Sequence, residues 1–334
     1  MPPILDVKDL VTRFDTLDGV VHAVNGVDFR LEEGETLAIV GESGSGKSVA
    51  MMSILGLIPS PPGRVESGSA IFQGPGGPQD LLRLSPKDLR DVRGAQVGFI
   101  FQDPGTTLNP ILTIGDQISE ILTRHMGMTA QQSRNRVLTL LEDVGIPDPE
   151  LRYKSYPFQL SGGMRQRVGI AMAIACTPQI IIADEPTTAL DVTVQAQVVD
   201  LFKRLRDKMG VAVIWITHDL GVVAGLAHRV MVMYAGRAAE VARVNDLYEH
   251  PLHPYTLGLL GALPRLDAVG SRRLVSIDGT PPDPLISVSH CPFAWRCTHA
   301  FPRCWAEAPR LTTVAPDHKA ACFYDLDKGR PRDA

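Results

Sequence analysis

The sequence predicts an α/β fold built on a mostly parallel sheet, followed by a small irregular C-terminal extension. Over the first 240 or so residues, short apolar runs rich in β-branched residues alternate with segments of helical periodicity. That alternation is typical of parallel strands joined by crossover helices. It then fades, and residues 250–334 are rich in proline and aromatic side chains. We therefore predict a first domain over residues 1–240 and an extension over residues 241–334.

The elements of the first domain follow one another in a regular order. Residues 47–58 have helical character that stops at Pro59, and residues 111–175 predict a largely helical region, assigned to a subdomain over about 103–175. Apolar spacing over residues 194–209 predicts another helix. The strands are predicted at residues 36–40, 97–101, 179–183, 211–217 and 230–234.

Composition and charge exclude several classes of protein. Of the 334 residues, 44% are apolar and 21% are charged, so wholesale disorder is excluded. The formal net charge is −4, which argues against a dedicated nucleic-acid binder. The N-terminus has no export signal, and no run of 18 apolar residues could span a membrane. We therefore expect an intracellular chain without nucleic acid as a partner.

Residues 41–48 read GESGSGKS, which fits the pattern of a phosphate-binding loop between a strand and a helix. The glycines let successive backbone N–H groups turn toward phosphate oxygens, and the helix N-terminus adds positive potential. Lys47 would reach the β- and γ-phosphates, and the Ser48 hydroxyl would ligate Mg²⁺. The candidate nucleotide-binding residues of this loop are Gly41, Ser43, Gly44, Ser45, Gly46, Lys47 and Ser48.

Two acids follow the apolar run at 179–183. Asp184, at the end of a buried strand, can hold Mg²⁺ directly or through water. Glu185 beside it can orient and polarise a water that attacks the terminal phosphate. A strand that merely ends at the surface would look similar, but the phosphate-binding loop favours the catalytic interpretation.

A second anion-binding motif, LSGGM, occupies residues 160–164 and opens a helix through Ser161, Gly162 and Gly163. One chain has little use for two such sites on one γ-phosphate, whereas two chains packed head to tail can each supply this motif to the other. With this motif, residues 4 to about 240 resemble the ATP-binding cassette (ABC) ATPases. The resemblance implies a P-loop NTPase core with antiparallel β and α-helical subdomains, and ATP and Mg²⁺ as its cofactors.

The same resemblance assigns further site residues. Gln102, in FQDP, matches the residue that senses Mg²⁺ and the attacking water, and His218 matches the histidine that contacts the γ-phosphate. Residues 189–191, Ala-Leu-Asp, match the loop that crosses the dimer interface, so Asp191 is expected at the nucleotide of a partner. Phe14 matches the aromatic residue that stacks on adenine, although the family more often has tyrosine there and a core position is the alternative.

The C-terminal extension resembles that of ATPase subunits from dipeptide/oligopeptide importers, through HPLHPYT at 250–256 and a late C-x5-C-x6-C-x17-C pattern. In the D-type subunit of these importers four such cysteines bind a 4Fe–4S cluster. The matching residues are Cys291, Cys297, Cys304 and Cys322. On residue chemistry alone, an iron–sulfur cluster, a zinc site and free buried thiols all stay open, although zinc ribbons usually have C-x2-C knuckles, which are absent here.

The resemblance therefore implies an ATPase subunit that powers di- or oligopeptide import, peripheral to the cytoplasmic face of the cell membrane. Its expected partners are a second cassette subunit of the paralogous F-type, two transmembrane permease subunits and, indirectly, an extracytoplasmic peptide-binding protein. The alternatives are an importer ATPase for nickel or another solute, a non-transport cassette ATPase, and a regulatory module whose cysteines sense iron or oxygen.

Overall fold

The computed structural model describes residues 2–188, 190–263 and 277–332. Within these residues, one sheet contains eight strands, and five consecutive neighbours that end at one edge of the sheet run parallel. The other three strands add to one edge in antiparallel fashion. In spatial order the strands are β11 (Thr312–Ala315), β12 (His318–Ala320), β10 (Arg237–Arg243), β9 (Arg229–Tyr234), β3 (Thr36–Val40), β8 (Ala212–Thr217), β7 (Ile180–Asp184) and β6 (Val97–Ile100). The predicted mostly parallel sheet is confirmed.

The central strands are the ones that the sequence predicts best. β3, β7 and β8 are buried along their whole length, so their sequences are continuous apolar runs rather than alternating patterns. Their observed bounds agree with the predicted ones to within one residue at each end. The carboxyl ends of these strands carry the phosphate-binding loop and the two acids.

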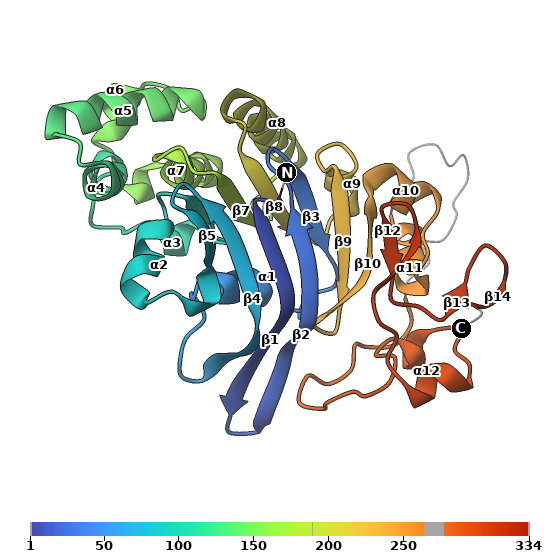
Figure 1. Cartoon of the computed structure of the whole chain (residues 1–334). Coiled ribbons are helices and arrows are strands. Elements are labelled where there is room, and N and C mark those ends of the chain that lie inside the picture. The colour runs from blue at the N-terminus through green and yellow to red at the C-terminus, as the bar shows by residue number, and fades with distance from the viewer. Residues whose placement is uncertain (1, 189, 264–276, 333–334) are drawn as a thin grey trace, which may run out of the picture.

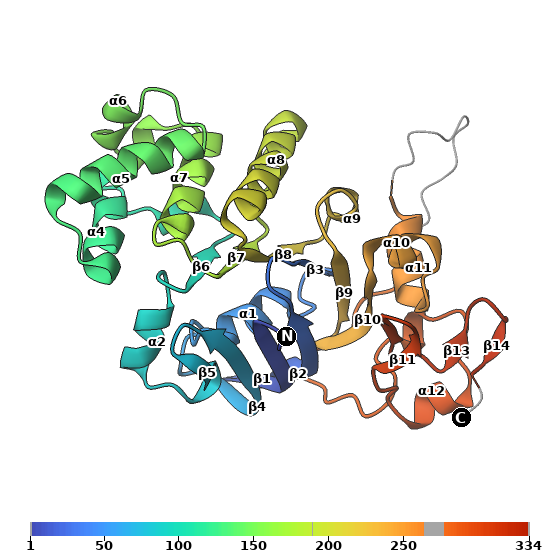
Figure 2. The same cartoon turned by 45° about the horizontal axis from the view of Figure 1, so that its top comes forward.

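An antiparallel sheet packs beside the main sheet, with helix α1 (Lys47–Ile54) between them (Figure 2). Its strands, in spatial order, are β2 (Gly19–Leu31), β1 (Leu5–Thr16), β4 (Gly63–Gly74) and β5 (Gly77–Asp80). A buried apolar cluster that includes Leu10, Met51 and Ile214 joins the two sheets through this helix. The helix ends at Ile54 and not at residue 58 as predicted, because Gly56 adopts a left-handed backbone with φ 56°.

The predicted helical region lies at one end of the molecule, beyond the β6 edge of the main sheet (Figures 1 and 2). It packs on the sheet through a core that includes Trp215 and Phe202, whose rings meet edge to face at 4.9 Å. The helices on this side and along the sheet are α2 (Pro86–Val92), α3 (Pro104–Thr107), α4 (Ile114–Met126), α5 (Ala130–Asp143), α6 (Pro149–Tyr153), α7 (Gly162–Ile174), α8 (Val192–Met209) and α9 (Leu220–Val223).

The C-terminal extension lies at the opposite end, against β9 and β10 (Figure 1). It is less irregular than the sequence predicts, because its hairpin β11–β12 continues the main sheet through β10. Its other elements are α10 (Val244–Glu249), α11 (Pro254–Gly261), α12 (Pro302–Ala306), β13 (Tyr324–Asp325) and β14 (Arg330–Pro331). Among the helices of the described residues, none has both the length and the apolar character that crossing a membrane requires.

A buried carboxyl group connects the extension to the sheet. Glu240 of β10 is fully buried, and its Oε1 accepts from the Leu252 N–H at 2.7 Å and lies 2.6 Å from His318 Nε2. Its Oε2 accepts from the His253 N–H at 3.0 Å. One side chain therefore holds the HPLHPYT loop and strand β12 against the cassette.

Candidate nucleotide site

The phosphate-binding loop connects the end of β3 to the start of α1, and only glycine fits two of its positions. Gly46 has φ 95°, and a Cβ atom there would lie 2.4 Å from the carbonyl oxygen of Ala23. Gly41 has φ 153°, and its Cβ would lie 2.2 Å from the carbonyl oxygen of Met233. The glycines therefore let the loop pass close to neighbouring backbone as well as turn its N–H groups toward an anion.

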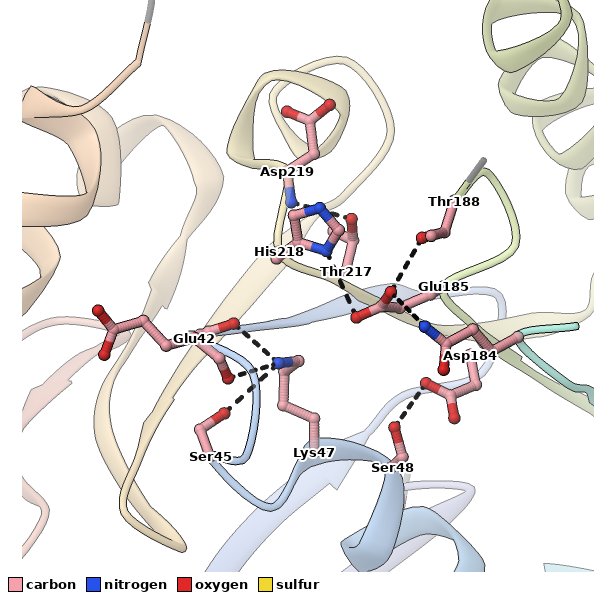
Figure 3. A network of polar contacts seen from close by, with 12 residues as sticks. Glu42, Ser45, Lys47, Ser48, Asp184, Glu185, Thr188, Thr217, His218 and Asp219 are labelled. Carbon is pink, nitrogen blue, oxygen red and sulfur yellow. Dashed lines mark hydrogen bonds and ion pairs between the residues drawn. The ribbon is translucent and has the colours of Figure 1, made fainter. Parts of the chain in front are cut away.

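Lys47 is held inside this loop (Figure 3). Its Nζ donates to the carbonyl oxygens of Gly41 at 2.8 Å and Glu42 at 2.9 Å, and its side chain is almost wholly buried. Burial lowers the pKa of the ammonium, whereas Glu185, Asp184 and Glu42 oppose that shift. The loop therefore concentrates one buried positive group where phosphate oxygens would lie.

Ser48 and Asp184 meet although they are 136 positions apart in the chain. The Ser48 hydroxyl, in the first turn of α1, donates to Asp184 Oδ1 at 2.8 Å at the end of β7. Burial raises the pKa of Asp184, and the hydrogen bond from Ser48 partly offsets this. A hydroxyl and a carboxylate are hard oxygen donors of the kind Mg²⁺ prefers, so this pair fits the ion that the sequence predicts.

Glu185 is the centre of the second polar cluster (Figure 3). Its backbone is left-handed, with φ 46°, and its N–H donates to the Ile216 carbonyl at 2.9 Å. Its Oε2 accepts from Gln102 Nε2 and from Thr188 Oγ1, each at 2.9 Å, and its Oε1 lies 3.4 Å from His218 Nδ1. The structure therefore brings together the three predicted catalytic residues, Glu185, Gln102 and His218.

Thr188 is the residue of this cluster that the sequence reasoning missed. It lies three residues after Glu185 in a turn, where its backbone N–H also donates to the Glu185 carbonyl at 3.1 Å. Hydroxyl side chains often bond locally in such turns, and the EPTT sequence gave that signal. Its hydrogen bond fixes the same carboxylate oxygen that Gln102 contacts.

The LSGGM motif opens α7 in the helical region. The Ser161 hydroxyl accepts from the Met164 N–H at 3.3 Å and so caps the helix, while Gly162 and Gly163 form its first turn. Within the described part of the chain, these residues form no hydrogen bond with the Glu185 cluster.

Asp191 caps the neighbouring helix. Its side chain accepts from the Val194 N–H at 2.9 Å at the start of α8. A Cβ on Gly163 would lie 3.1 Å from Val194 Cγ1, so this helix start packs next to the LSGGM motif. Ala189, the first residue of the predicted interface loop, lies outside the described residues.

A pocket of about 520 Å³ adjoins the phosphate-binding loop. Phe14, on β1, lines it together with loop residues 43–46, so the residue predicted to stack on adenine faces this space. Part of the wall belongs to the extension, at residues 281–284 and 286–288. The sequence analysis assigned no nucleotide contact to the extension.

The comparisons with known proteins agree with this geometry. Residues 24–188 match the family described as ABC transporter, and residues 239–304 match the one described as oligopeptide/dipeptide transporter, C-terminal region. A dipeptide transport ATP-binding protein, DppD, of Bacillus subtilis is 52% identical over 97% of this chain and 95% of its own length. The chain belongs to the ABC transporter ATPases of the oligopeptide/dipeptide importer family.

Further relatives of this ABC ATPase support the assignment. An oligopeptide transport ATP-binding protein, OppD, of Bacillus subtilis is 49% identical over 99% of this chain and 92% of its own length. Among solved structures, the dimeric cassette MJ0796 bound to ADP and Pi has a TM-score of 0.64 and 28% identity, covering 72% of this chain and 98% of that one. The P-loop ABC ATPase fold predicted from the sequence is therefore confirmed.

The four cysteines of this ABC ATPase, predicted to bind a 4Fe–4S cluster, lie in the C-terminal extension. Among the described residues, no group of three or more His, Cys, Asp or Glu side chains is arranged to hold a metal ion. Burial raises the pKa of Cys291 to about 11 and that of Cys322 to about 12. Cys291 and Cys304 instead pack in the apolar core of the extension, so the 4Fe–4S prediction is not supported.

Proposed function

We propose that this chain binds and hydrolyses ATP to power the import of di- or oligopeptides, as one cassette of a dimer that works with permease subunits. The observation that carries the proposal is the Glu185 carboxylate, which Gln102, Thr188 and His218 hold beside the phosphate-binding loop. The peptide substrate is supported by the relatives, which are named as dipeptide and oligopeptide transport ATP-binding proteins.

In the proposed reaction Glu185 accepts a proton from the water that attacks the γ-phosphate. Donors on Oε2 orient the carboxylate, and His218 lies on the other oxygen, 59% exposed and free to turn toward a phosphate. Lys47 supplies positive charge at the phosphates. Ser48 and Asp184 would hold Mg²⁺, which shields the phosphate charges when it is bound.

The dimer is part of this proposal. Ser161, Gly162, Gly163 and Asp191 would complete the nucleotide site of a partner cassette, because they form a separate group from the Glu185 cluster of their own chain. We propose a paralogous F-type chain as that partner. Size-exclusion chromatography with light scattering, on Glu185→Gln mixed with the F-type chain and ATP, tests the arrangement: a stable dimer of the two chains supports it, and separate monomers at saturating ATP contradict it.

We propose that the permease subunits dock at an apolar pocket of about 260 Å³ between β6 and the helical region. The pocket lies next to Gln102, so a docked helix would act directly on the Glu185 cluster. Its lining includes Leu57, Phe99, Phe101, Thr107, Ile121 and Met172. Phe101→Ser should abolish coupled transport while the ATPase rate of the separate subunit stays within about twofold, because the pocket lies outside the phosphate site.

The substrate is tested in vesicles that contain the permease subunits, both cassettes and the external binding protein. Uptake of a labelled dipeptide should require ATP and should disappear with Glu185→Gln in this chain. Uptake of nickel without peptide uptake would contradict the peptide assignment and leave the ATPase assignment intact. The protein would act peripherally at the cytoplasmic face of the membrane.

We also propose the division at residue 240 as a functional boundary. Residues 1–240 contain the motifs of hydrolysis, and residues 241–334 contain the family-specific extension. The boundary is not a gap in the fold, because β10 crosses it.

An iron–sulfur cluster on Cys291, Cys297, Cys304 and Cys322 is kept as a proposal that needs a chemical test. Its support is that these thiols lie in one small region, where the Cys291 N–H donates to the Cys304 carbonyl at 3.0 Å. Anaerobic purification followed by iron, sulfide and zinc analysis decides it. Four irons per chain support the cluster, bound zinc supports the alternative metal, and a metal-free folded protein contradicts both.

A further inference from the structure

The C-terminal extension reaches the phosphate-binding loop through one ion pair. Arg296 Nη1 donates to Glu42 Oε2 at 2.7 Å, and Arg296 Nη2 donates to Glu42 Oε1 at 2.9 Å. The two residues are 254 positions apart, and Glu42 is the second residue of the loop. The Arg296 side chain is 4% exposed and that of Glu42 is 29% exposed. A two-point, largely buried pair of this kind fixes geometry as well as charge.

The backbone of Glu42 is held by the extension as well. Its N–H donates to the hydroxyl of Tyr255, a fully buried residue of α11, at 2.9 Å. Tyr255 packs with Tyr234 and Phe293 in one aromatic group, and Arg296 Nη1 also donates to the Tyr234 hydroxyl at 3.4 Å. The extension therefore contacts both the backbone and the side chain of one phosphate-loop residue.

This residue also contacts the phosphate-site lysine. The Glu42 carbonyl oxygen accepts from Lys47 Nζ at 2.9 Å, while its carboxylate points away from Lys47 (Figure 3). A shift of Glu42 would therefore move the carbonyl group that holds Lys47. Without Arg296, its carboxylate would be an uncompensated negative charge beside a site for a triphosphate.

The extension contacts the rest of the nucleotide pocket at a separate place. The Pro284 carbonyl oxygen accepts from the His22 N–H of β2 at 2.8 Å. This contact seats residues 281–284 on the wall of the 520 Å³ pocket that Phe14 also lines. The extension thus borders the pocket beside Phe14 and, through Arg296, contacts the phosphate-binding loop at Glu42.

We propose that Arg296 is a positioning residue for nucleotide binding, and that the extension is a part of the ATP site of this chain. Arg296 neutralises the Glu42 carboxylate and fixes the loop that carries Lys47. The proposal rests on ATP binding by the cassette and does not depend on which solute the transporter carries.

The test uses the full-length chain and Mg·ATP, with no permease or peptide in the assay. Arg296→Gln, which removes the charge and keeps a hydrogen-bonding side chain, should raise the KM for ATP by about tenfold while kcat stays within about twofold. Glu42→Gln in the same chain should return KM to within about threefold of the parent, because the uncompensated carboxylate is then gone. Arg303→Gln removes a half-buried arginine of the same extension that pairs with Glu307, so it is the matched control and should leave KM unchanged.

An unchanged KM in Arg296→Gln overturns the proposal, and so does a raised KM that Glu42→Gln fails to restore, because a purely structural role of Arg296 would not respond to the charge on Glu42. Where Arg296→Gln does not fold, Arg296→Lys keeps the charge with a single donor group, and a KM equal to that of the parent would overturn the proposed two-point positioning. Loss of peptide transport with normal ATP binding would count against peptide import and leave these results unaffected.

Discussion

The phosphate-binding loop and the C-terminal extension border the same nucleotide pocket, but they are built in opposite ways. The loop acts through eight consecutive residues whose backbone is shaped by glycines such as Gly46. The extension acts through single side chains, Tyr255 and Arg296, that reach Glu42 from 213 and 254 positions away. The groups that would contact the nucleotide therefore lie in a short motif, whereas the side chains that position this motif come from distant parts of the chain.

The two regions also differ in how their buried polar groups are satisfied. In the loop, Lys47 and the nearby Asp184 have pKa values shifted by burial toward their neutral forms, and each would gain from a charged ligand. Where the extension meets the main sheet, Glu240 already has its hydrogen bonds within the protein, to Leu252, His253 and His318. The polar groups of the loop are therefore arranged to bind a charged ligand, whereas Glu240 attaches the extension to the sheet.

The largest expected effect separates catalysis from binding. Glu185→Gln should lower the ATP hydrolysis rate by about 10³-fold, because the amide cannot accept the proton of the attacking water. Nucleotide affinity should stay within about threefold, since Lys47 and the loop are intact. Steady-state phosphate release and binding of a fluorescent ATP analogue measure the two quantities.

Glu142→Gln, an exposed residue of α5, is the matched control for that variant and should keep full activity. Hydrolysis by Glu185→Gln at more than about a tenth of the parent rate would contradict the role of Glu185.

The next prediction concerns the attachment of the extension. Glu240→Ala should lower the free energy of unfolding by about 4 kcal/mol, because it leaves two buried N–H groups and His318 without an acceptor. Denaturant unfolding of the full chain measures the loss, and limited proteolysis should cut the extension before the cassette. Glu249→Ala, on the exposed end of α10, should change neither, and equal stability of the two variants would show that Glu240 does not hold the extension.

We expect His253 to make the free energy of unfolding depend on pH, by about 3 kcal/mol. Burial lowers its pKa to about 4 from an ordinary value of 6.5, while nearby Glu240 partly opposes the shift. The unfolded chain therefore binds more protons than the folded chain between pH 6.5 and 4. Stability is full above pH 6.5 and falls progressively toward pH 4, by about 3 kcal/mol for this residue.

Free energies of unfolding measured at steps from pH 7.5 to pH 4.5 test this prediction. His253→Gln should flatten the slope in that window, whereas His250→Gln, at an exposed neighbouring position, should keep it. The same slope in all three proteins would exclude His253 as its source.

The smallest expected effect concerns Ser48 and Asp184, the two residues that would hold Mg²⁺. Ser48→Ala should weaken the apparent affinity for Mg²⁺ in the ATPase reaction by about tenfold, because one oxygen donor beside Asp184 is lost. Nucleotide binding measured in EDTA should be unchanged, which separates loss of the metal site from damage to the loop. An unaltered Mg²⁺ titration would remove Ser48 from the metal site.

The sequence predicts one of the compared regions far better than the other. The loop, Asp184 and Glu185 are recognisable because a buried parallel strand is a continuous apolar run and its end fixes the polar residues that follow. Gln102 and His218 need the family pattern, since neither is close to Glu185 in the chain. Thr188 gave only a weak local signal.

The contribution of the extension could not be predicted in the same way. Nothing in the sequence around Arg296 indicates that its partner is Glu42, because an ion pair between distant residues leaves no periodicity or spacing to detect. The strands β11 and β12 are short, β11 is exposed along its whole length and β12 alternates between buried and exposed residues, so they gave no apolar run either. The cysteine pattern, by contrast, gave a clear prediction of a metal site that the arrangement of the side chains does not support.

Hydrogen–deuterium exchange on the full chain, with and without Mg·ATP, tests most directly whether the two regions form one nucleotide site. We expect ATP to slow the exchange of amides in residues 41–48 and, to a comparable degree, in residues 281–296, because Arg296, Tyr255 and Pro284 connect the extension to the pocket. Protection of residues 41–48 alone, with residues 281–296 exchanging at the same rate in both states, would contradict the account.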